Sequence, residues 1–292
     1  MQPSPAVRRA ARLLGHLAEH PGRAFTVSEL ARTLGQNRAT CQAILLSLEG
    51  VDWVRRDDRK AWGLGPGLIA LGDAAETSLP GIDAMRSGVA ALHERLGFEA
   101  LATIATGDQI VVAAHAGASS ILPPAMRVGQ AIPFVPPFGL VFVAWSGDEA
   151  FDRWLARAAA PIPRRDVARC RRAAGLAREL GYCMTLDPVT RRSLGNVMAR
   201  LAREPRSAET ISRRDRLMQA MTHDEYLVVD PDPLRAPHVS QLAAPVFGPA
   251  GDVVAAISVV ASPQQISVGN AARLADALMA CARGVTARLA GR

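Results

Sequence analysis

This chain of 292 residues lacks the long apolar segments of a membrane or secreted protein. Its longest apolar runs, such as Val253 to Ala261, are far shorter than the roughly 20 residues that span a bilayer. Near the N-terminus, Arg8, Arg9 and Arg12 interrupt the apolar residues, so the sequence there has no signal-peptide core. We therefore expect a cytoplasmic protein that has no membrane partner.

Cysteine is scarce, and the usual catalytic motifs are missing. Only four cysteines occur, and no two form a CxxC pair: Cys41, Cys170, Cys183 and Cys281. Their spacing argues against a zinc site and a disulfide framework, and favours buried thiols. The sequence contains no GxGxxG, Walker lysine, HExxH or GxSxG motif, and its six histidines show no triad or metal-ligand spacing. We expect no catalytic residues, no metal and no cofactor.

Lysine is almost absent, because Lys60 is the only one, yet arginine gives the chain a formal net charge of +7. The residues up to Gly65 carry ten basic and six acidic side chains. Such an excess favours a polyanionic partner. Solvated arginines are common on helix surfaces, however, so the charge alone does not decide the function.

The first 65 residues have the pattern of three helices followed by a hairpin. Apolar spacing predicts helices over 7–19, from 27 to 34 and over 38–49. Thr26 and Glu29 form a capping box for the second helix, and Asn37 suits the N-cap of the third. Two short strands over 53–56 and 60–64 follow, joined by a charged turn at 57–59.

This order predicts a winged helix-turn-helix domain over 1–65 that binds double-stranded DNA. In the third helix, Arg38 can bind guanine and Gln42 can bind adenine, while Thr40 can reach a base or a phosphate. The basic hairpin would contact phosphates or the adjacent minor groove. The expected DNA-binding residues are Asn37, Arg38, Ala39, Thr40, Gln42, Arg55, Arg56, Arg59 and Lys60. Winged helices also serve protein assembly, which remains the alternative interpretation.

The remaining residues predict a linker helix over 66–81 and an α+β domain over 82–292. The expected strands are 100–105, 110–115, 122–128, 242–247 and 253–260, and the expected helices are 82–96, 140–145, 148–158, 166–180 and 266–289. These elements indicate a mainly antiparallel sheet flanked by helices. An arginine-rich helical stretch over 189–225 looks like an insertion, either a solvated helical pair or a phosphate-contacting surface.

Several stretches resemble the isocitrate-lyase-regulator (IclR) family of bacterial transcription factors. They are Ser28 to Gly35 with Thr40, Leu45, Leu48-Glu49 and Leu64-Gly65, then Arg127 to Gly129 with Pro133, Gly181-Tyr182, and Leu242 to Phe247 with Gly251 and Ala255 to Val259. The resemblance covers nearly the whole chain in order. It implies a regulator whose C-terminal domain, a curved GAF- or profilin-like sheet, binds a small organic effector.

The resemblance also implies an effector pocket against that sheet. Backbone N–H groups of Gly139 and Leu140, at the start of a helix, would suit a carboxylate because helix N-termini carry partial positive charge. The expected polar contacts are Asp187, Gln241 and Ser258, and the expected apolar wall is Met126, Phe134 and Phe138. Plain core packing is the simpler interpretation of the three apolar residues, and a bond to a neighbouring backbone is the simpler one for Ser258.

Departures from the family pattern limit what the resemblance implies. Ala43 stands where the third helix usually has a basic residue, and Asn37 stands where it usually has proline, so no operator sequence is implied. Leu140 replaces a frequent lysine and Val260 a frequent serine. We therefore expect an apolar or aromatic acid as the effector, rather than a small 2-oxo acid.

Because a single winged helix reads one short half-site, we expect a homodimer on symmetric DNA, with the helix over 68–79 as the pairing surface. The resemblance implies that a dimer of dimers also occurs. The direction of regulation depends on where the operator lies relative to the promoter, and repression is favoured over activation. Two alternatives stay open: a ligand-binding module that uses its winged helix for assembly, and an enzyme with an incidental winged helix.

Overall fold

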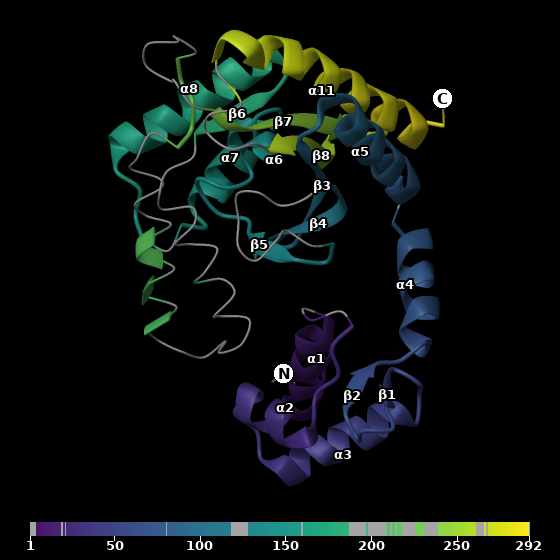
Figure 1. Ribbon diagram of the computed structural model, residues 1–292. Helices are drawn as coiled ribbons and strands as arrows, with labels where there is room; N and C mark the ends of the chain where they lie inside the picture. Colours follow the sequence, from purple (N-terminus) through teal and green to yellow (C-terminus); the bar gives the residue numbers. More distant parts are fainter. Residues whose placement is uncertain are drawn as a thin grey trace. The chain divides into compact units, whose positions relative to one another are not determined.

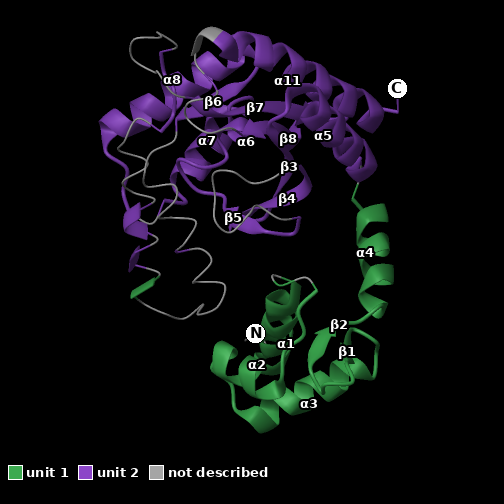
Figure 2. Cartoon of the chain, in the orientation of Figure 1, with its two compact units in different colours: residues 1–79, 199–211 green, residues 80–198, 212–292 purple. Residues whose placement is uncertain are grey.

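The computed structural model divides into two compact units (Figures 1 and 2). Unit 1 comprises residues 1–79 with 199–211, and unit 2 comprises 80–198 with 212–292. The structure describes residues 4–18, 20, 22–79, 81–117, 128–158, 160–186, 197, 209–210, 212–213, 215–217, 226–230, 239–260, 266 and 268–291.

Unit 1 contains the three helices and the hairpin that the sequence predicts. These are α1 (Pro5–Ala18), α2 (Val27–Leu34), α3 (Arg38–Glu49), β1 (Val54–Arg56) and β2 (Trp62–Leu64). Their apolar faces meet in one cluster around the fully buried side chains of Leu13, Leu30, Leu45 and Trp62. Phe25 pairs with Trp62 through two backbone hydrogen bonds, so the segment before α2 extends the hairpin sheet.

The predicted caps of α2 and α3 are confirmed. The Thr26 hydroxyl accepts the N–H of Glu29, and a Glu29 carboxylate oxygen accepts the N–H of Thr26 at 2.8 Å, which completes the capping box. The Asn37 side-chain oxygen accepts the N–H of Ala39 at 2.8 Å. Gly35 adopts a left-handed conformation (φ 61°), which turns the chain sharply between the two helices.

Two closely packed glycines, Gly65 and Gly67, lie where the hairpin leads into α4 (Gly67–Thr77). Gly65 donates its N–H to the carbonyl of Trp53, and Gly67 donates its N–H to that of Asp52. A Cβ at Gly65 would lie 2.1 Å from the carbonyl oxygen of Asp52, so only glycine fits there. In the monomer, α4 has no buried residue.

Unit 2 is built on a six-stranded antiparallel sheet with the order β5-β4-β3-β8-β7-β6 (Figure 1). The strands are β3 (Glu99–Thr106), β4 (Gln109–Ala116), β5 (Ala131–Pro133), β6 (Cys183–Leu186), β7 (Val239–Phe247) and β8 (Val253–Val260). Successive side chains of a strand point to opposite faces, so the sheet has two distinct surfaces.

One face of the sheet is covered by α5 (Ile82–Leu96) and α11 (Val268–Leu289), which pack on each other and on the strands (Figure 1). The shared core includes Val89 of α5, Leu278 of α11, and Leu242 and Ile257 of the sheet. This face therefore forms a continuous apolar core.

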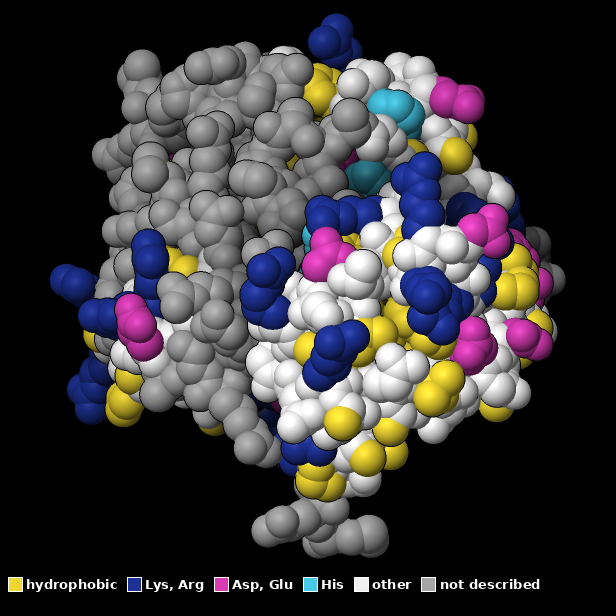
Figure 3. Space-filling model, turned by 60° about the horizontal axis from the view of Figure 1, so that its bottom comes forward, with side chains coloured by type: hydrophobic (Ala, Val, Ile, Leu, Met, Phe, Trp, Pro, Cys, Tyr) yellow, Lys and Arg dark blue, Asp and Glu magenta, His cyan; other side chains and the backbone are white. Residues whose placement is uncertain are grey.

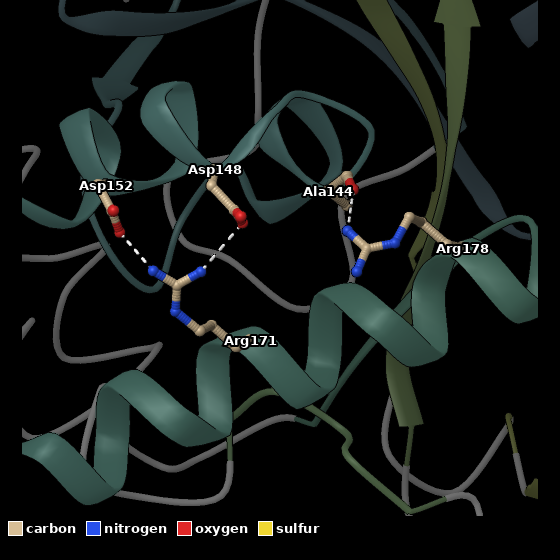
Figure 4. Close-up of polar contacts among 5 residues, drawn as sticks. All are labelled: Ala144, Asp148, Asp152, Arg171 and Arg178. Atoms are coloured by element: carbon tan, nitrogen blue, oxygen red, sulfur yellow. Dashed lines mark hydrogen bonds and ion pairs between the residues drawn. The ribbon is translucent and has the colours of Figure 1, made fainter.

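Part of the opposite face is covered by α6 (Leu140–Val143), α7 (Asp148–Leu155) and α8 (Arg164–Leu180), which share a second apolar cluster with Ala243 and Ala256. Figure 4 shows Arg171 of α8 pointing to the carboxylates of Asp148 and Asp152 of α7, at 3.2 and 2.6 Å. Arg178 donates to the carbonyl of Ala144, at the end of α6, at 2.6 Å. These contacts link the three helices, which are held mainly by their shared apolar cluster. The two ion pairs are solvent-exposed and add little to stability.

Some predicted elements need correction. Of the strand predicted over 122–128, only Val128 is described, and it lies in a turn; the edge strand is β5, three residues further on. The strand β6 was not predicted. In the hairpin of β1 and β2, which is the wing of the domain, Lys60 lies in the turn with φ 59° rather than in a strand. Most of 189–225 lies outside the described residues, so the insertion stays a prediction.

We predict that Gly65→Ala lowers the stability of unit 1 by about 1–3 kcal/mol, because the new Cβ would overlap the Asp52 carbonyl. Gly63→Ala is the matched control, since a Cβ there meets nothing within 4 Å. Amide hydrogen exchange of the full chain under increasing urea measures the opening of residues 22–79. Equal protection in the two variants would contradict the close packing at Gly65.

Candidate nucleic-acid interface and effector face

The helix α3 carries four of the predicted DNA-binding residues, which lie away from its buried side. Its inward side places Cys41, Leu45 and Leu48 in the unit 1 core. On the outward side, Arg38 and Ala39 are exposed, and Thr40 and Gln42 are half-buried. Figure 3 views the molecule from below and shows basic side chains spread over the described surface, with apolar side chains between them.

The sequence places Ala39 and Ala43 on this face, but the exposed Leu46, which completes an apolar stripe, was not predicted. Ala39, Ala43 and Leu46 follow one another at i, i+4 and i+7, and all three are exposed, Leu46 at 51%. Leu46 is apolar and directly follows the buried Leu45, so the sequence pattern alone does not show that its side chain points outward. The outward face of α3 therefore combines two polar side chains, Arg38 and Gln42, with a stripe of methyl groups.

The wing turn is organised by one carboxylate. An oxygen of Asp57 accepts the N–H groups of Arg59 and Ala61 at 2.9 and 2.8 Å, and the backbone of Asp57 bonds to Lys60 and Ala61. This arrangement presents Arg59 and Lys60 at the tip, where both are exposed. Of the remaining predicted wing residues, Arg55 is exposed on β1, and the Arg56 guanidinium lies over the Trp62 ring at 5.7 Å.

In unit 2, the predicted polar contacts Gln241 and Ser258 do lie together. Gln241 of β7 donates to the Ser258 hydroxyl of β8 at 3.1 Å, and the strand register places both on the face opposite α5 and α11. Thr185 of β6 lies directly across from Gln241. Its hydroxyl oxygen is buried and has no hydrogen-bond partner among the described residues. We name this face, away from α5 and α11, the effector face.

The other predicted pocket residues lie toward the far end of the strands. Gly139 (φ 82°) packs so closely that a Cβ would lie 2.5 Å from the Phe134 ring and 2.9 Å from Ile110. Ile110 pairs with Ala105, which is four residues, or about 13 Å, along β3 from Leu101, the partner of Ser258.

These residues belong to the apolar cluster under α6 to α8. Leu140 is 4% exposed, and Phe134 packs edge-on against Phe142 with the Arg157 guanidinium 4.8 Å above its ring. Phe138 packs edge-on against Tyr226. Their contacts are those of core residues, so a role in the pocket stays a prediction. Met126 and Asp187 lie outside the described residues.

A buried polar contact between Glu99 and His115 on the effector face was also missed from the sequence. His115 Nε2 of β4 lies 3.0 Å from a carboxylate oxygen of Glu99 on β3, and the two side chains are 18% and 2% exposed. Glu99 is the first residue of β3 and His115 the second-to-last residue of β4, and no motif joins them. Only the pairing of β3 with β4 brings them together.

The cysteines are packed rather than reactive. Burial raises the pKa of the Cys183 thiol to about 12 and, with Asp166 nearby, that of Cys170 to about 11. Burial also raises the pKa of Cys41 and of Cys281. Within the described ranges, no three His, Cys, Asp or Glu side chains gather as a metal would require. Within those ranges too, every helix is too short or too polar to cross a membrane.

We predict that Cys170 and Cys183 of the native protein resist iodoacetamide at pH 8, because the thiolate is the reactive form and their raised pKa values keep both thiols protonated. Mass spectrometry after timed labelling measures each site, and the urea-unfolded chain, in which all four cysteines react, is the control. Rapid labelling of Cys183 in the native state would contradict its burial.

Two protein-family models match the chain. The model of the IclR helix-turn-helix domain matches residues 6–58, and the model of the bacterial transcriptional regulator IclR C-terminal domain matches residues 183–287. A search of curated proteins finds no match.

Solved structures of IclR regulators share this fold over nearly their whole length. An IclR transcriptional regulator from Alicyclobacillus acidocaldarius is 23% identical, with a TM-score of 0.63, over 99% of this chain and 100% of its own. The IclR of Thermotoga maritima is 15% identical, with a TM-score of 0.64, over 97% and 98%. An IclR homologue from Microbacterium hydrocarbonoxydans, solved in complex with 4-hydroxybenzoate, is 17% identical, with a TM-score of 0.63, over 98% and 100%.

The helix-turn-helix match falls on α1 to the wing, and the C-terminal match begins at β6 and ends in α11. The expected resemblance is thereby confirmed at both ends of the chain. This chain belongs to the IclR family of DNA-binding transcription regulators, which join a helix-turn-helix domain to an effector-binding C-terminal domain and are not enzymes.

Proposed function

We propose that the protein is a one-component sensor, a repressor whose unit 1 reads a short DNA half-site and whose unit 2 binds an apolar or aromatic acid. The observation that carries the proposal is the outward face of α3 beside a basic, well-ordered wing. A helix of this size and exposure fits the major groove, and the wing then lies along the neighbouring backbone.

On α3, each exposed group has a partner in the major groove. Arg38 binds the O6 and N7 atoms of guanine, and Gln42 binds adenine, each through two hydrogen bonds. Thr40 reaches a base or a phosphate. The exposed stripe of Ala39, Ala43 and Leu46 favours thymine methyl groups. Asn37 is engaged as the cap of α3, so only its amide nitrogen is left for a phosphate.

The wing supplies the affinity that does not depend on sequence. Arg55, Arg59 and Lys60 extend into solvent from the hairpin, where they can contact phosphates or the minor groove. Arg56, over the Trp62 ring, contributes as a fixed positive charge. Because each phosphate contact releases counterions, binding weakens as salt rises.

A dimer is proposed because one winged helix reads only one half-site. The helix α4 supports this proposal, since none of its residues is buried and its apolar side chains Ile69 and Leu71 are 68% and 45% exposed. Pairing of α4 with its counterpart in a second copy would cover those side chains. Use of the winged helix for protein assembly is the alternative that a DNA-binding measurement decides.

The effector is proposed to bind on the effector face near Gln241 and Ser258. Between the polar groups of this face lie Leu101 and Val260, which favour an apolar body in the ligand. The complex of the Microbacterium homologue with 4-hydroxybenzoate supports an aromatic acid as the first class to test.

We predict that Arg38→Ala weakens binding to the cognate fragment by about 1–3 kcal/mol, since one guanine contact is lost, and weakens binding to unrelated DNA much less. Arg95→Ala, an exposed arginine of α5, removes the same charge and is the control. Fluorescence anisotropy measures the Kd on both fragments over a range of salt. If the two variants lose specific affinity equally, α3 does not read the bases.

We predict that Asp57→Ala lowers DNA affinity at least several-fold because the wing turn loses the acceptor of two backbone N–H groups. Asp57→Asn removes the same negative charge but keeps a side-chain oxygen, so it should retain or raise the affinity. The same anisotropy assay compares them. An alanine variant that binds as well as the asparagine variant would show that wing order is irrelevant to binding.

We predict that aromatic acids raise the melting temperature of the protein and shift its affinity for the cognate fragment. Differential scanning fluorimetry with a panel of benzoates, phenylacetates and small 2-oxo acids tests this. Stabilisation by the small hydrophilic acids alone would refute the aromatic class. Effector-weakened DNA binding supports repression relieved by ligand, whereas strengthened binding would argue against it.

A further inference from the structure

We propose that the operator of this protein is marked by thymine methyl groups at a fixed spacing, and that Leu46 of α3 is the specificity-determining residue for one of them. The inference rests on the proposed function, because it assumes that α3 enters the major groove. It names the class of base sequence that the groove must present and the residue that reads its far end, which the family match leaves open.

The stripe of Ala39, Ala43 and Leu46 lies at the centre of the outward face of α3. At about 100° per residue, the three side chains fall within an arc of about 60°, roughly opposite the core side of the helix. Figure 1 shows α1, α2 and the hairpin of β1 and β2 all on the other side of α3. A helix that docks by its outward face therefore points the stripe at the floor of the groove, where the base edges lie.

The centre of this face is apolar along its whole length. The only basic residue of α3 is Arg38, its first, and the only acidic residue is Glu49, its last. Ser47, beside the stripe, donates its hydroxyl proton to the carbonyl of Ala43 at 2.9 Å, so that proton is not offered to a base. Arg38 and Gln42, four residues apart, lie along one flank of the stripe. The flank therefore selects bases by hydrogen bonds, and the centre selects them by apolar contact.

An exposed apolar stripe can also bind a protein, and the surroundings of this one favour DNA. The wing belongs to the same core as α3 and carries the exposed cations Arg55, Arg59 and Lys60, which complement phosphates beside a groove. Two of the three stripe residues are alanine, whose short side chain lets the helix backbone approach the bases. The energetic centres of protein interfaces are instead enriched in tryptophan, tyrosine and arginine.

The apolar feature of the major-groove edges is the C5-methyl group of thymine, for which alanine is a known apolar partner. Cytosine carries only a hydrogen at C5, so contact with the methyl group discriminates between the two pyrimidines. Leu46, which is 51% exposed, has apolar surface available for such a contact. Burial of one group of this size is worth about three- to fourfold in Kd.

The length of the stripe sets the spacing of the thymines. Ala39 and Leu46 are seven residues apart, which is about 10.5 Å along the helix axis and about three base-pair steps of 3.4 Å. For a helix that lies along the groove, we expect each half-site to present thymines within a span of about four base pairs. The thymine read by Leu46 lies at the end of this span away from the guanine bound by Arg38.

Replacement of thymidine by deoxyuridine in the cognate fragment tests the inference, because deoxyuridine lacks only the methyl group and keeps the hydrogen bonds of thymine. Each duplex carries deoxyuridine at one symmetric pair of positions, and fluorescence anisotropy with the full chain gives its Kd. For each contacted pair we expect about tenfold weaker binding, since one methyl group is lost in each half-site. Thymines outside the contacted span are the control and should show no effect.

Leu46→Ala then identifies the residue that reads the far thymine. In this variant, deoxyuridine should cease to weaken binding at the pair farthest from the guanine of Arg38 and should still do so at the other pairs. Val7→Ala, which truncates a 67% exposed apolar side chain of α1, is the matched control and should keep every deoxyuridine effect. The unfolding midpoint of both variants is measured alongside, and the exposure of both side chains predicts little change.

Two outcomes would overturn the inference while leaving the proposed function intact. The first is specific binding that no deoxyuridine substitution weakens, and the second is a set of deoxyuridine effects that Leu46→Ala leaves unchanged. Equal loss of affinity on all duplexes in Leu46→Ala, together with dissociation of the oligomer in sedimentation, would assign the stripe to protein assembly and also overturn it. No sequence-specific binding at all would refute the proposed function, and this inference with it.

Discussion

The pairing of β8 with β7 on one side and β3 on the other is the constraint on which unit 2 depends. The β3–β8 pairing joins residues more than 150 positions apart, such as Ile104 and Ala255, and the whole register decides which side chains face α5 and α11 and which face away. A slip of one residue would move every core side chain to the wrong face. In the observed register, Val259 and Ile257 enter the main core, while Val260 and Ser258 line the effector face.

In unit 1, the helix α3 likewise divides its side chains between the core and the solvent. Leu45 anchors α3 in the core around Trp62, and the next residue, Leu46, is exposed. The hydrogen bonds between Phe25 and Trp62 tie the wing to the segment that enters α2, so α3 and the wing share one core. Under the proposed function, this open surface is the one that meets DNA.

The sequence predicted those elements whose signals are local. The capping box at Thr26 and Glu29, the Asn37 cap and the β7–β8 hairpin each depend on residues close together in the chain, and all were confirmed. The strand β6 was missed because its four residues are shorter than a readable alternation and become a strand only by pairing with β7. Lys60 was predicted to lie in a strand. The hydrogen bonds of Asp57 that turn the chain at this point have no clear signature in the sequence.

In the candidate site too, contacts between residues close in the sequence could be predicted, and contacts between distant residues could not. Gln241 and Ser258 could be predicted together because they belong to one hairpin. The Glu99–His115 pair could not, since neither residue carries a motif and their contact requires the folded β3–β4 ladder. The Phe134 and Gly139 positions were identified by resemblance, yet the structure packs them beside Ile110. The partner of Ile110, Ala105, lies about 13 Å along β3 from Leu101, the residue paired with Ser258.

The central claim is that unit 1 reads a specific DNA sequence under the control of a ligand in unit 2. It is tested most directly by selecting fragments of the source genome bound by the full protein, with and without aromatic acids. The account predicts enrichment of a few fragments that share a two-fold symmetric sequence, with the enrichment lost or altered when the acid is present. Uniform recovery of genomic DNA, or recovery of none, would contradict it.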